Sequence, residues 1–292
     1  MTENRTRGIL WMLATMACFI SLDAIMKLGL EQYSLVQVTW GRFFFATLFA
    51  AIWCGPALPT LAKSKAPAQQ TVRSIFLMVT TGLFNTGIMF VPLATATTIM
   101  FLTPIITTVL SVLVLKEHVG LRRWAGVAMG FAGATIVVQP WTAFSGTFNA
   151  GALFLIAAAA TNASYQIATR KVRADHPKTS LLFTAAFGAV VCSFLLPWHW
   201  QWPDLYGWTL LAGSGAAGAL GHYCIIKAFS NAPASVVAPF SYSSLIWATL
   251  LGYVIWGDIA TSYSFWMGAT LIIASGLYIF WRERVKQVPN NT

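Results

Sequence analysis

Residues 221–258 read GHYCIIKAFSNAPASVVAPFSYSSLIWATLLGYVIWGD and contain most of one apolar run and the whole of the next. His222 lies inside the first run, where an ionisable side chain is costly. Pro239 lies inside the second run and is followed by a cluster of hydroxyl groups. A proline frees a backbone carbonyl, which a membrane tolerates mainly where protein or a water-filled cavity hydrogen-bonds to it. The stretch therefore predicts a broken membrane helix beside a binding site near the bilayer midplane, although such a proline also serves as a packing device.

The overall composition predicts a protein that crosses a membrane many times. The chain has 292 residues, of which 57% are hydrophobic and 9% are charged, whereas a soluble domain carries about 25% charged residues. The net charge of +10 is spread over short loops, so we do not expect a nucleic-acid partner. All four cysteines lie inside apolar runs without metal-ligand spacing, and we expect no metal site.

Ten apolar segments of about 20 residues can be drawn, and this length crosses a bilayer. Sixteen of the eighteen Lys and Arg residues then fall on the side that holds both termini, and only Lys27 and Arg42 lie elsewhere. The positive-inside rule places that side in the cytoplasm. The third and fourth segments nearly fuse around Pro92, which leaves a nine-segment alternative. The expected segments are 8–28, 35–55, 74–92, 95–115, 121–139, 149–168, 179–197, 207–228, 235–256 and 263–281.

The two halves of the chain share a pattern. Residues 109–126 read VLSVLVLKEHVGLRRWAG and residues 250–268 read LLGYVIWGDIATSYSFWMG. Each stretch has an apolar run, one acid, a short joint, and then Trp and Gly two positions apart. We therefore predict two five-helix repeats, residues 1–144 and 145–292, and the second is inverted because five is odd. Inverted repeats are typical of secondary transporters, with the substrate site between the repeats.

The run PIITTVLSVLVLKE at 104–117 and its echo APFSYSSLIWATLLGYVIWGD at 238–258 carry a family resemblance. Together with the glycine-rich segments that follow, they resemble the EamA-type drug/metabolite transporters over essentially the whole chain. Within that superfamily the chain is most similar to the YddG-type exporters of aromatic amino acids. The resemblance implies an all-α integral membrane protein of ten transmembrane helices in two inverted five-helix repeats. It also implies a central cavity and efflux across the cell inner membrane.

Three charged residues lie at membrane depth near the outer side. Asp23 and Lys27 are four residues apart, so they share one face of a helix, and Arg42 lies on the next segment. A lone charge at the bilayer centre costs about 2.5–3.5 kcal/mol on insertion scales, so we expect Asp23 and Lys27 to pair. A structural ion network and a functional outer gate are both compatible with this pattern.

The candidate substrate site is uncharged apart from one histidine. His222 could donate to a substrate carboxylate or relay a proton, or it could be a neutral histidine that hydrogen-bonds between helices. Helix–helix hydrogen bonding would explain any single uncharged member equally well. The expected lining is His222, Tyr223, Ser241, Tyr242, Ser244 and Trp247, with Asn85, Tyr165 and Gln166 behind them.

These features predict a secondary transporter that exports small metabolites, above all aromatic amino acids, by alternating access. The chain has no phosphate-binding GK[ST] loop and no HExxH motif, so we expect neither ATP drive nor metal catalysis, and no cofactor. The expected partners are a small-molecule substrate and the lipid bilayer, without an obligate protein partner. A multidrug or cationic-compound exporter is the alternative within the superfamily, and a membrane-embedded lipid-modifying enzyme is the alternative from another class. The coupling ion and the oligomeric state stay open.

Overall fold

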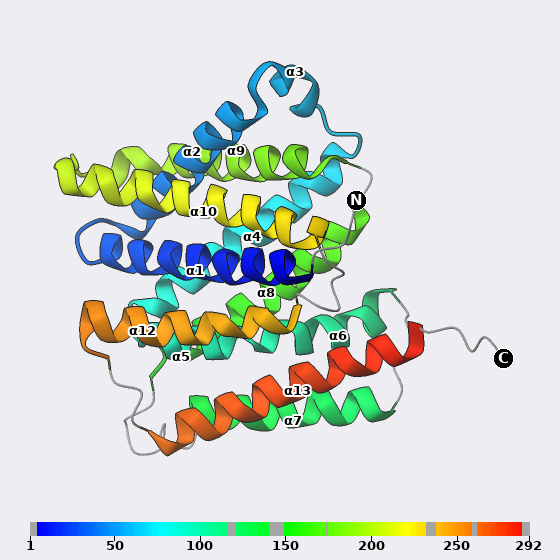
Figure 1. Cartoon of the computed structure of the whole chain (residues 1–292). Helices are drawn as coiled ribbons and strands as arrows, with labels where there is room; N and C mark the ends of the chain where they lie inside the picture. Colours follow the sequence, from blue (N-terminus) through cyan, green and yellow to red (C-terminus); the bar gives the residue numbers. More distant parts are fainter. Residues whose placement is uncertain are drawn as a thin grey trace.

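The structure is a computed structural model that describes residues 5–115, 121–139, 149–172, 175–231, 238–258 and 262–287. All regular secondary structure in these residues is helical, as the composition predicted (Figure 1). In chain order the elements are α1 (Arg5–Leu30), α2 (Leu35–Cys54), the 3₁₀ helix η1 (Gly55–Ala57), α3 (Leu58–Leu61), α4 (Pro67–Ile88), α5 (Leu93–Met100), α6 (Leu102–Leu115), α7 (Leu121–Val138), α8 (Gly151–Lys171), α9 (Pro177–Leu195), η3 (Leu196–Trp198), α10 (Leu205–Asn231), η4 (Ala238–Ser243), α12 (Ser244–Trp256) and α13 (Tyr263–Gln287).

Several helices have the length and hydropathy of membrane spans. Among the described residues, six segments are at least 18 residues long and apolar enough to cross a bilayer, and three further apolar helices are shorter. A multi-pass membrane protein fits this pattern. The six long segments are Thr6–Leu30, Leu35–Leu61, Leu93–Val114, Gly151–Thr169, Pro177–Trp198 and Leu205–Phe229.

The helices run side by side in one bundle, and α1 begins on the side where α13 ends (Figure 1). Elements from the two halves of the chain pack on each other: α1 lies against α10 and α12, α4 against α8, α2 against α9, and α7 against α13. The interface between the halves is therefore long, and a cavity formed there receives side chains from both.

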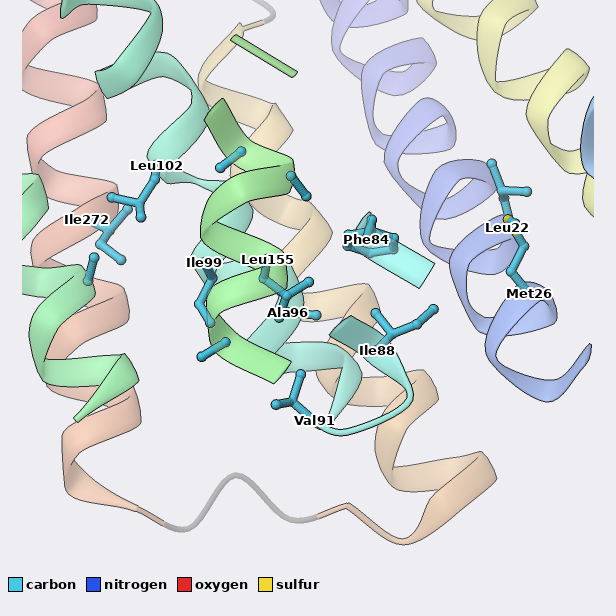
Figure 2. Close-up of a cluster of buried hydrophobic side chains, with 14 of the residues drawn as sticks. Leu22, Met26, Phe84, Ile88, Val91, Ala96, Ile99, Leu102, Leu155 and Ile272 are labelled. Carbon is cyan, nitrogen blue, oxygen red and sulfur yellow. The ribbon is translucent and has the colours of Figure 1, made fainter. Parts of the chain in front are cut away.

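The largest buried apolar cluster holds the middle of the bundle together. It joins Leu22 and Met26 of α1 to Ile88 of α4, Leu155 of α8 and Ile272 of α13 (Figure 2). Lipid tails are as apolar as these side chains, so close packing rather than escape from water stabilises such contacts in a membrane.

Glycines permit a close crossing between α7 and α13. A Cβ on Gly268 of α13 would lie 2.6 Å from the carbonyl oxygen of Gly133 on α7. A Cβ on Gly133 would lie 2.8 Å from the carbonyl oxygen of Gly268. No side chain fits at these distances, so small residues on both helices let the two backbones approach.

Two interrupted helices occupy matching places in the two halves. In the first half, α5 ends at Met100 and α6 begins at Leu102, with Phe101 as the joint. In the second half, the 3₁₀ helix η4 spans Ala238–Ser243 and leads directly into α12. The break expected around Pro239 is therefore present as a change from 3₁₀ to α geometry. Phe101 at the first joint and Ser244 just after the second both line one cavity between the helices.

Candidate functional site

A cavity of about 350 Å³, here called the central cavity, lies between α1, α2, α4, α5, α8, α10 and α12. Its two charged lining residues are Asp23 on α1 and Arg42 on α2. Phe19, Phe84 and Phe101 provide aromatic walls. The uncharged polar groups that line it are Thr80, Thr81, Thr97, Asn162, Tyr165, His222 and Ser244.

Arg42 contacts uncharged groups in the cavity and interacts electrostatically with one acidic residue, Asp23. Its Nη1 donates to Thr81 Oγ1 at 3.2 Å and lies 3.9 Å from Met26 Sδ. Its opposite charge is Asp23, with which it interacts electrostatically. A carboxylate and a guanidinium that face one cavity can bind both charges of a zwitterion, because each prefers the opposite ion as partner.

Aromatic contacts position the neutral part of the lining. The His222 ring meets Phe19 edge-on at 5.3 Å between centroids, and Tyr242 meets Phe101 edge-on at 5.0 Å. Such edge contacts hold rings in defined orientations. Thr97 is buried, and its Oγ1 has no hydrogen-bond partner among the described groups. That hydroxyl is therefore available to a solute or a water molecule in the cavity.

A second cavity of about 430 Å³, here called the inner cavity, adjoins the first. Arg42, Leu77, Tyr165 and His222 line both cavities. The inner cavity reaches the end of the bundle where α9 begins, with Asp175 in its wall. A path between the two spaces therefore passes these four shared side chains.

The inner cavity is lined by Arg73, a buried arginine. The expected segment limits place this residue in a loop on the cytoplasmic side. The third segment was expected to begin at residue 74, but α4 begins earlier, at Pro67, so Arg73 lies within the helix. A proline in the first helical turn is a common start signal and could have indicated this boundary. Arg73 contacts α8 and α9 through Tyr165 Oη at 2.5 Å and the Ser180 carbonyl oxygen at 3.0 Å.

The structure separates the expected site residues into two groups. His222, Tyr165 and Ser244 line the central cavity, and Tyr242 touches its Phe101 wall. Ser241 is part of the same 3₁₀ helix as Tyr242, but neither is among the described lining residues of the cavity.

The remaining expected residues point elsewhere, and helix periodicity explains two of them. Tyr223 packs edge-on against Trp11 and Trp53, and it lines a separate shallow pocket. Gln166 is exposed and accepts from Thr107 on α6 at 3.4 Å. Each is one residue after a cavity-lining residue, and one residue is about 100° of helical rotation, so the side chain leaves the cavity face.

Two further expected residues serve helix packing. Asn85 is fully buried and donates to Thr39 Oγ1 on α2 at 3.1 Å, and its own Oδ1 has no partner among the described groups. Trp247 packs against the cluster that contains Ile20 and Leu93. These contacts join neighbouring helices, which is the alternative use that polar and aromatic groups have in membranes.

The expected pairing of Asp23 with Lys27 is wrong. The Lys27 Nζ donates to the Val91 carbonyl oxygen at 3.1 Å and lies 3.9 Å from Asp258 Oδ2. It also lies 4.7 Å from the centroid of the Trp256 ring. The reason is tertiary: α12 packs against α1, which brings an acid from the end of α12 to Lys27 and leaves Asp23 facing the cavity.

The comparisons with known proteins agree on one family. The model of the EamA-like transporter family matches residues 6–139 and again residues 149–281. The chain is 28% identical over 279 residues to the S-adenosylmethionine uptake transporter of Rickettsia prowazekii (strain Madrid E), covering 95% of this chain and 93% of that protein. It is also 28% identical over 281 residues to the riboflavin transporter of Vibrio cholerae serotype O1, covering 94% and 92%.

A solved crystal structure shares the fold. Its TM-score to this chain is 0.65 at 19% sequence identity, and the match covers 98% of this chain and 100% of the other. At this identity the likeness concerns the path of the backbone and carries no information about the solute.

Proposed function

Because the chain belongs to the EamA-like transporter family, we propose that it moves a small zwitterionic metabolite with an aromatic ring across the membrane by alternating access. The family and its curated relatives are transporters, so the protein is not an enzyme, and the lipid-modifying alternative is dropped.

The proposal includes the finer architecture that the sequence predicted. Ten transmembrane helices would be α1, α2, α4, α5 with α6, α7, α8, α9, α10, η4 with α12, and α13. Two inverted five-helix repeats, residues 1–144 and 145–292, would each contain one of the two interrupted helices. The double match of the family model supports this division. The charge bias supports cytoplasmic termini and, in a bacterium, an inner-membrane location.

One observation carries the substrate class. Asp23 and Arg42 face the same cavity, and the phenyl rings of Phe19, Phe84 and Phe101 line it as well. The carboxylate would bind a substrate ammonium and the guanidinium would bind a substrate carboxylate. The aromatic walls would take a flat ring in edge or stacked contact. A fixed phosphate would call for paired cations, whereas Arg42 has an acid beside it.

This class includes two of the candidate solutes and disfavours a third. Aromatic amino acids and S-adenosylmethionine, which the Rickettsia relative is named for, both combine an amino-acid group with a flat ring. Riboflavin, which the Vibrio relative is named for, has a flat ring without a zwitterion. We propose export of aromatic amino acids as the first candidate. The Rickettsia relative is named for uptake and we propose export, but both directions are compatible with alternating access, since the substrate site can open to either side of the membrane.

The test is solute flux in proteoliposomes with L-phenylalanine, L-tryptophan, S-adenosylmethionine, riboflavin and tetraphenylphosphonium. Wild-type protein should move at least one zwitterion, and Arg42→Gln should lower that flux tenfold or more, because a hydrogen bond to a charged group contributes about 1.5–3 kcal/mol. Asp23→Asn should act in the same direction. Tyr223→Phe is the matched control, since this side chain lies outside the central cavity.

Two outcomes would overturn the proposal. Preferential transport of riboflavin or tetraphenylphosphonium would exclude a site built for a zwitterion. Zwitterion flux that is unchanged in Arg42→Gln would show that this cavity does not bind the carboxylate.

A further inference from the structure

We propose that Arg73 and Tyr165 form a second binding subsite, in the inner cavity, that takes the anionic group of the substrate before or after its stay in the central cavity. The inference rests on the proposed function in one respect, namely that the substrate carries a carboxylate. Its other supports are the burial and the charge of Arg73 and the free hydrogen-bond donors of both residues.

Arg73 is a buried cation without a paired anion. The residue is 6% exposed. Its acceptors on α8 and α9 are uncharged and include Thr169 Oγ1 at 2.9 Å. Within the part of the chain that the structure describes, no carboxylate lies within ion-pair distance of it. Asp175 is connected to it only through the Gln70 side chain, whose Nε2 donates to Asp175 at 2.9 Å and whose Oε1 is 3.5 Å from Arg73 Nη1.

An unpaired buried charge has a physical cost that points to a ligand. Removal of an ion from water costs several kcal/mol unless an opposite charge or a set of good hydrogen bonds offsets it. In membrane proteins such groups mark the paths of substrates and ions. Asp23 offsets the charge of Arg42, whereas the groups that accept hydrogen bonds directly from Arg73 are all uncharged. A passing carboxylate would supply the missing charge.

Arg73 and Tyr165 each have one hydrogen-bond donor that no described acceptor uses, and the two donor atoms are neighbours. A guanidinium has five N–H groups. The Nε and Nη1 groups of Arg73 donate to Thr169, Thr184, Gln70 and the Ser180 carbonyl, while Nη2 donates to Tyr165 Oη alone among the described acceptors. One Nη2 hydrogen is therefore unused. Because Tyr165 accepts from Arg73, the hydroxyl hydrogen of Tyr165 is also available. The two donor atoms are 2.5 Å apart and suit the two oxygens of one carboxylate.

The position of Tyr165 connects this subsite with the central cavity. Tyr165 lines both cavities, as Arg42 does. A carboxylate could therefore pass from Arg73 to Arg42 while it stays within reach of the Tyr165 hydroxyl. Phe43, Leu181 and Ile226 give the inner cavity apolar walls for a ring. Asp175 also lines the inner cavity, but its carboxylate already accepts from the Ser64 hydroxyl, the Lys65 backbone N–H and the Gln70 side chain, so the inner subsite should not require the amine.

The experiment compares three probes that differ in their charged groups: 3-phenylpropionate, L-phenylalanine and 2-phenylethylamine. Binding to purified protein would be measured by isothermal titration for wild type, Arg73→Gln, Tyr165→Phe and Lys63→Gln. Lys63 is exposed on the same end of the molecule, outside both cavities, and controls for the loss of one positive charge.

We expect 3-phenylpropionate to bind the wild type and the Lys63→Gln variant alike. Arg73→Gln should raise its dissociation constant tenfold or more, and Tyr165→Phe should raise it severalfold. The affinity for 2-phenylethylamine should not change in any variant. If Arg73→Gln is not monodisperse and so cannot be measured, the dissociation constant of Tyr165→Phe for 3-phenylpropionate decides between the outcomes. This substitution removes one hydroxyl group and keeps the aromatic ring.

Three results would overturn the subsite: no binding of 3-phenylpropionate to the wild type, equal affinity in wild type and in both cavity variants, or an equal loss for the amine probe. Flux separates this inference from the proposed function. If 3-phenylpropionate binds through Arg73 but no zwitterion is transported, the proposed function fails and the subsite stands. If a zwitterion is transported and Arg73→Gln changes neither its flux nor probe binding, the subsite alone fails.

Discussion

Replacement of Lys27 by methionine tests whether the charge network at the end of α12 is the one that the structure shows. Lys27 contacts Asp258, the Val91 carbonyl and the Trp256 ring, and all of these lie beyond its own helix. Trp256 is itself anchored, because its Nε1 donates to Glu31 at 2.6 Å. A change at position 27 should therefore loosen the contact between α1 and α12, whereas a purely local pair with Asp23 would predict no such effect.

The expected magnitude follows from distance and exposure. Two unit charges 4 Å apart interact by about 4 kcal/mol at an effective dielectric constant near 20. The Lys27 and Asp258 side chains are 14% and 30% exposed, and their 3.9 Å separation is too long for a hydrogen bond. The pair should therefore contribute nearer to the value of exposed pairs, about 1 kcal/mol. Loss of the hydrogen bond to Val91 adds about 1 kcal/mol, and loss of the contact with Trp256 adds about 0.5–1 kcal/mol.

The assay is a pair of double-mutant cycles on the free energy of unfolding in detergent. One cycle combines Lys27→Met with Asp258→Asn, and the other combines Lys27→Met with Asp23→Asn. Lys27→Met alone should lower the free energy of unfolding by about 2–3 kcal/mol, the sum of the three contacts. The coupling energy should be about 1 kcal/mol for Lys27 with Asp258, and within about 0.5 kcal/mol of zero for Lys27 with Asp23, as for residues that share no contact.

A larger coupling with Asp23 than with Asp258 would refute this reasoning. It would mean that the local i,i+4 pair forms in the membrane and that Asp23 is not available to the cavity. The proposed zwitterion site would then lose its acid.

The remaining predictions concern acid stability, helix packing and topology. Hydrogen bonds from Gln70, and after it Ser64, hold the pKa of Asp175 below its usual value of 3.8, so this carboxylate stabilises the folded state above that pH and ceases to do so as the pH falls through the lowered pKa. The melting temperature of wild type should therefore fall more steeply than that of Asp175→Asn on acidification below about pH 4, and parallel curves would contradict this. Gly268→Ala should destabilise the protein by about 1–3 kcal/mol in thermal unfolding, the usual cost of overpacking. Gly82→Ala, where a Cβ meets nothing within 4 Å, should not, and equal effects would show that α7 and α13 are not tightly apposed. A cysteine at Asp204 should react with an impermeant maleimide from outside and a cysteine at Lys171 should not, and the reverse pattern would overturn the proposed topology.

Some of the candidate site followed from residue type alone. An ionisable residue inside an apolar run is costly unless it faces protein or water, which is why His222 could be expected to face inward. The structure places it in the wall of both cavities. The same reasoning applied to Asp23 and Arg42, whose burial in an apolar segment requires a partner or a polar cavity. That these groups bind substrate stays a prediction.

Other parts depended on details that residue type does not contain. Tyr223 and Gln166 were expected at the site as polar side chains within apolar segments, but the helix turns each of them away from the cavity. Arg73 was counted with the loop charges because its helix was expected to begin one residue after it. A shift of a few residues in a helix boundary is enough to convert a solvated cation into a buried one.

The motif resemblance indicated a transporter family, and the sequence by itself determined the class of the molecule: an all-helical membrane protein with few charges and a repeated hydropathy pattern. These properties follow from summed hydropathy and charge, which do not depend on which helices become neighbours. Only the tertiary structure decided which acid pairs with Lys27, because Asp258 is 231 positions away in the chain and reaches it through the packing of α12 on α1. It also decided that Arg73 faces a cavity. Both outcomes depend on contacts between distant segments, and local composition carries no information about the energies of those contacts.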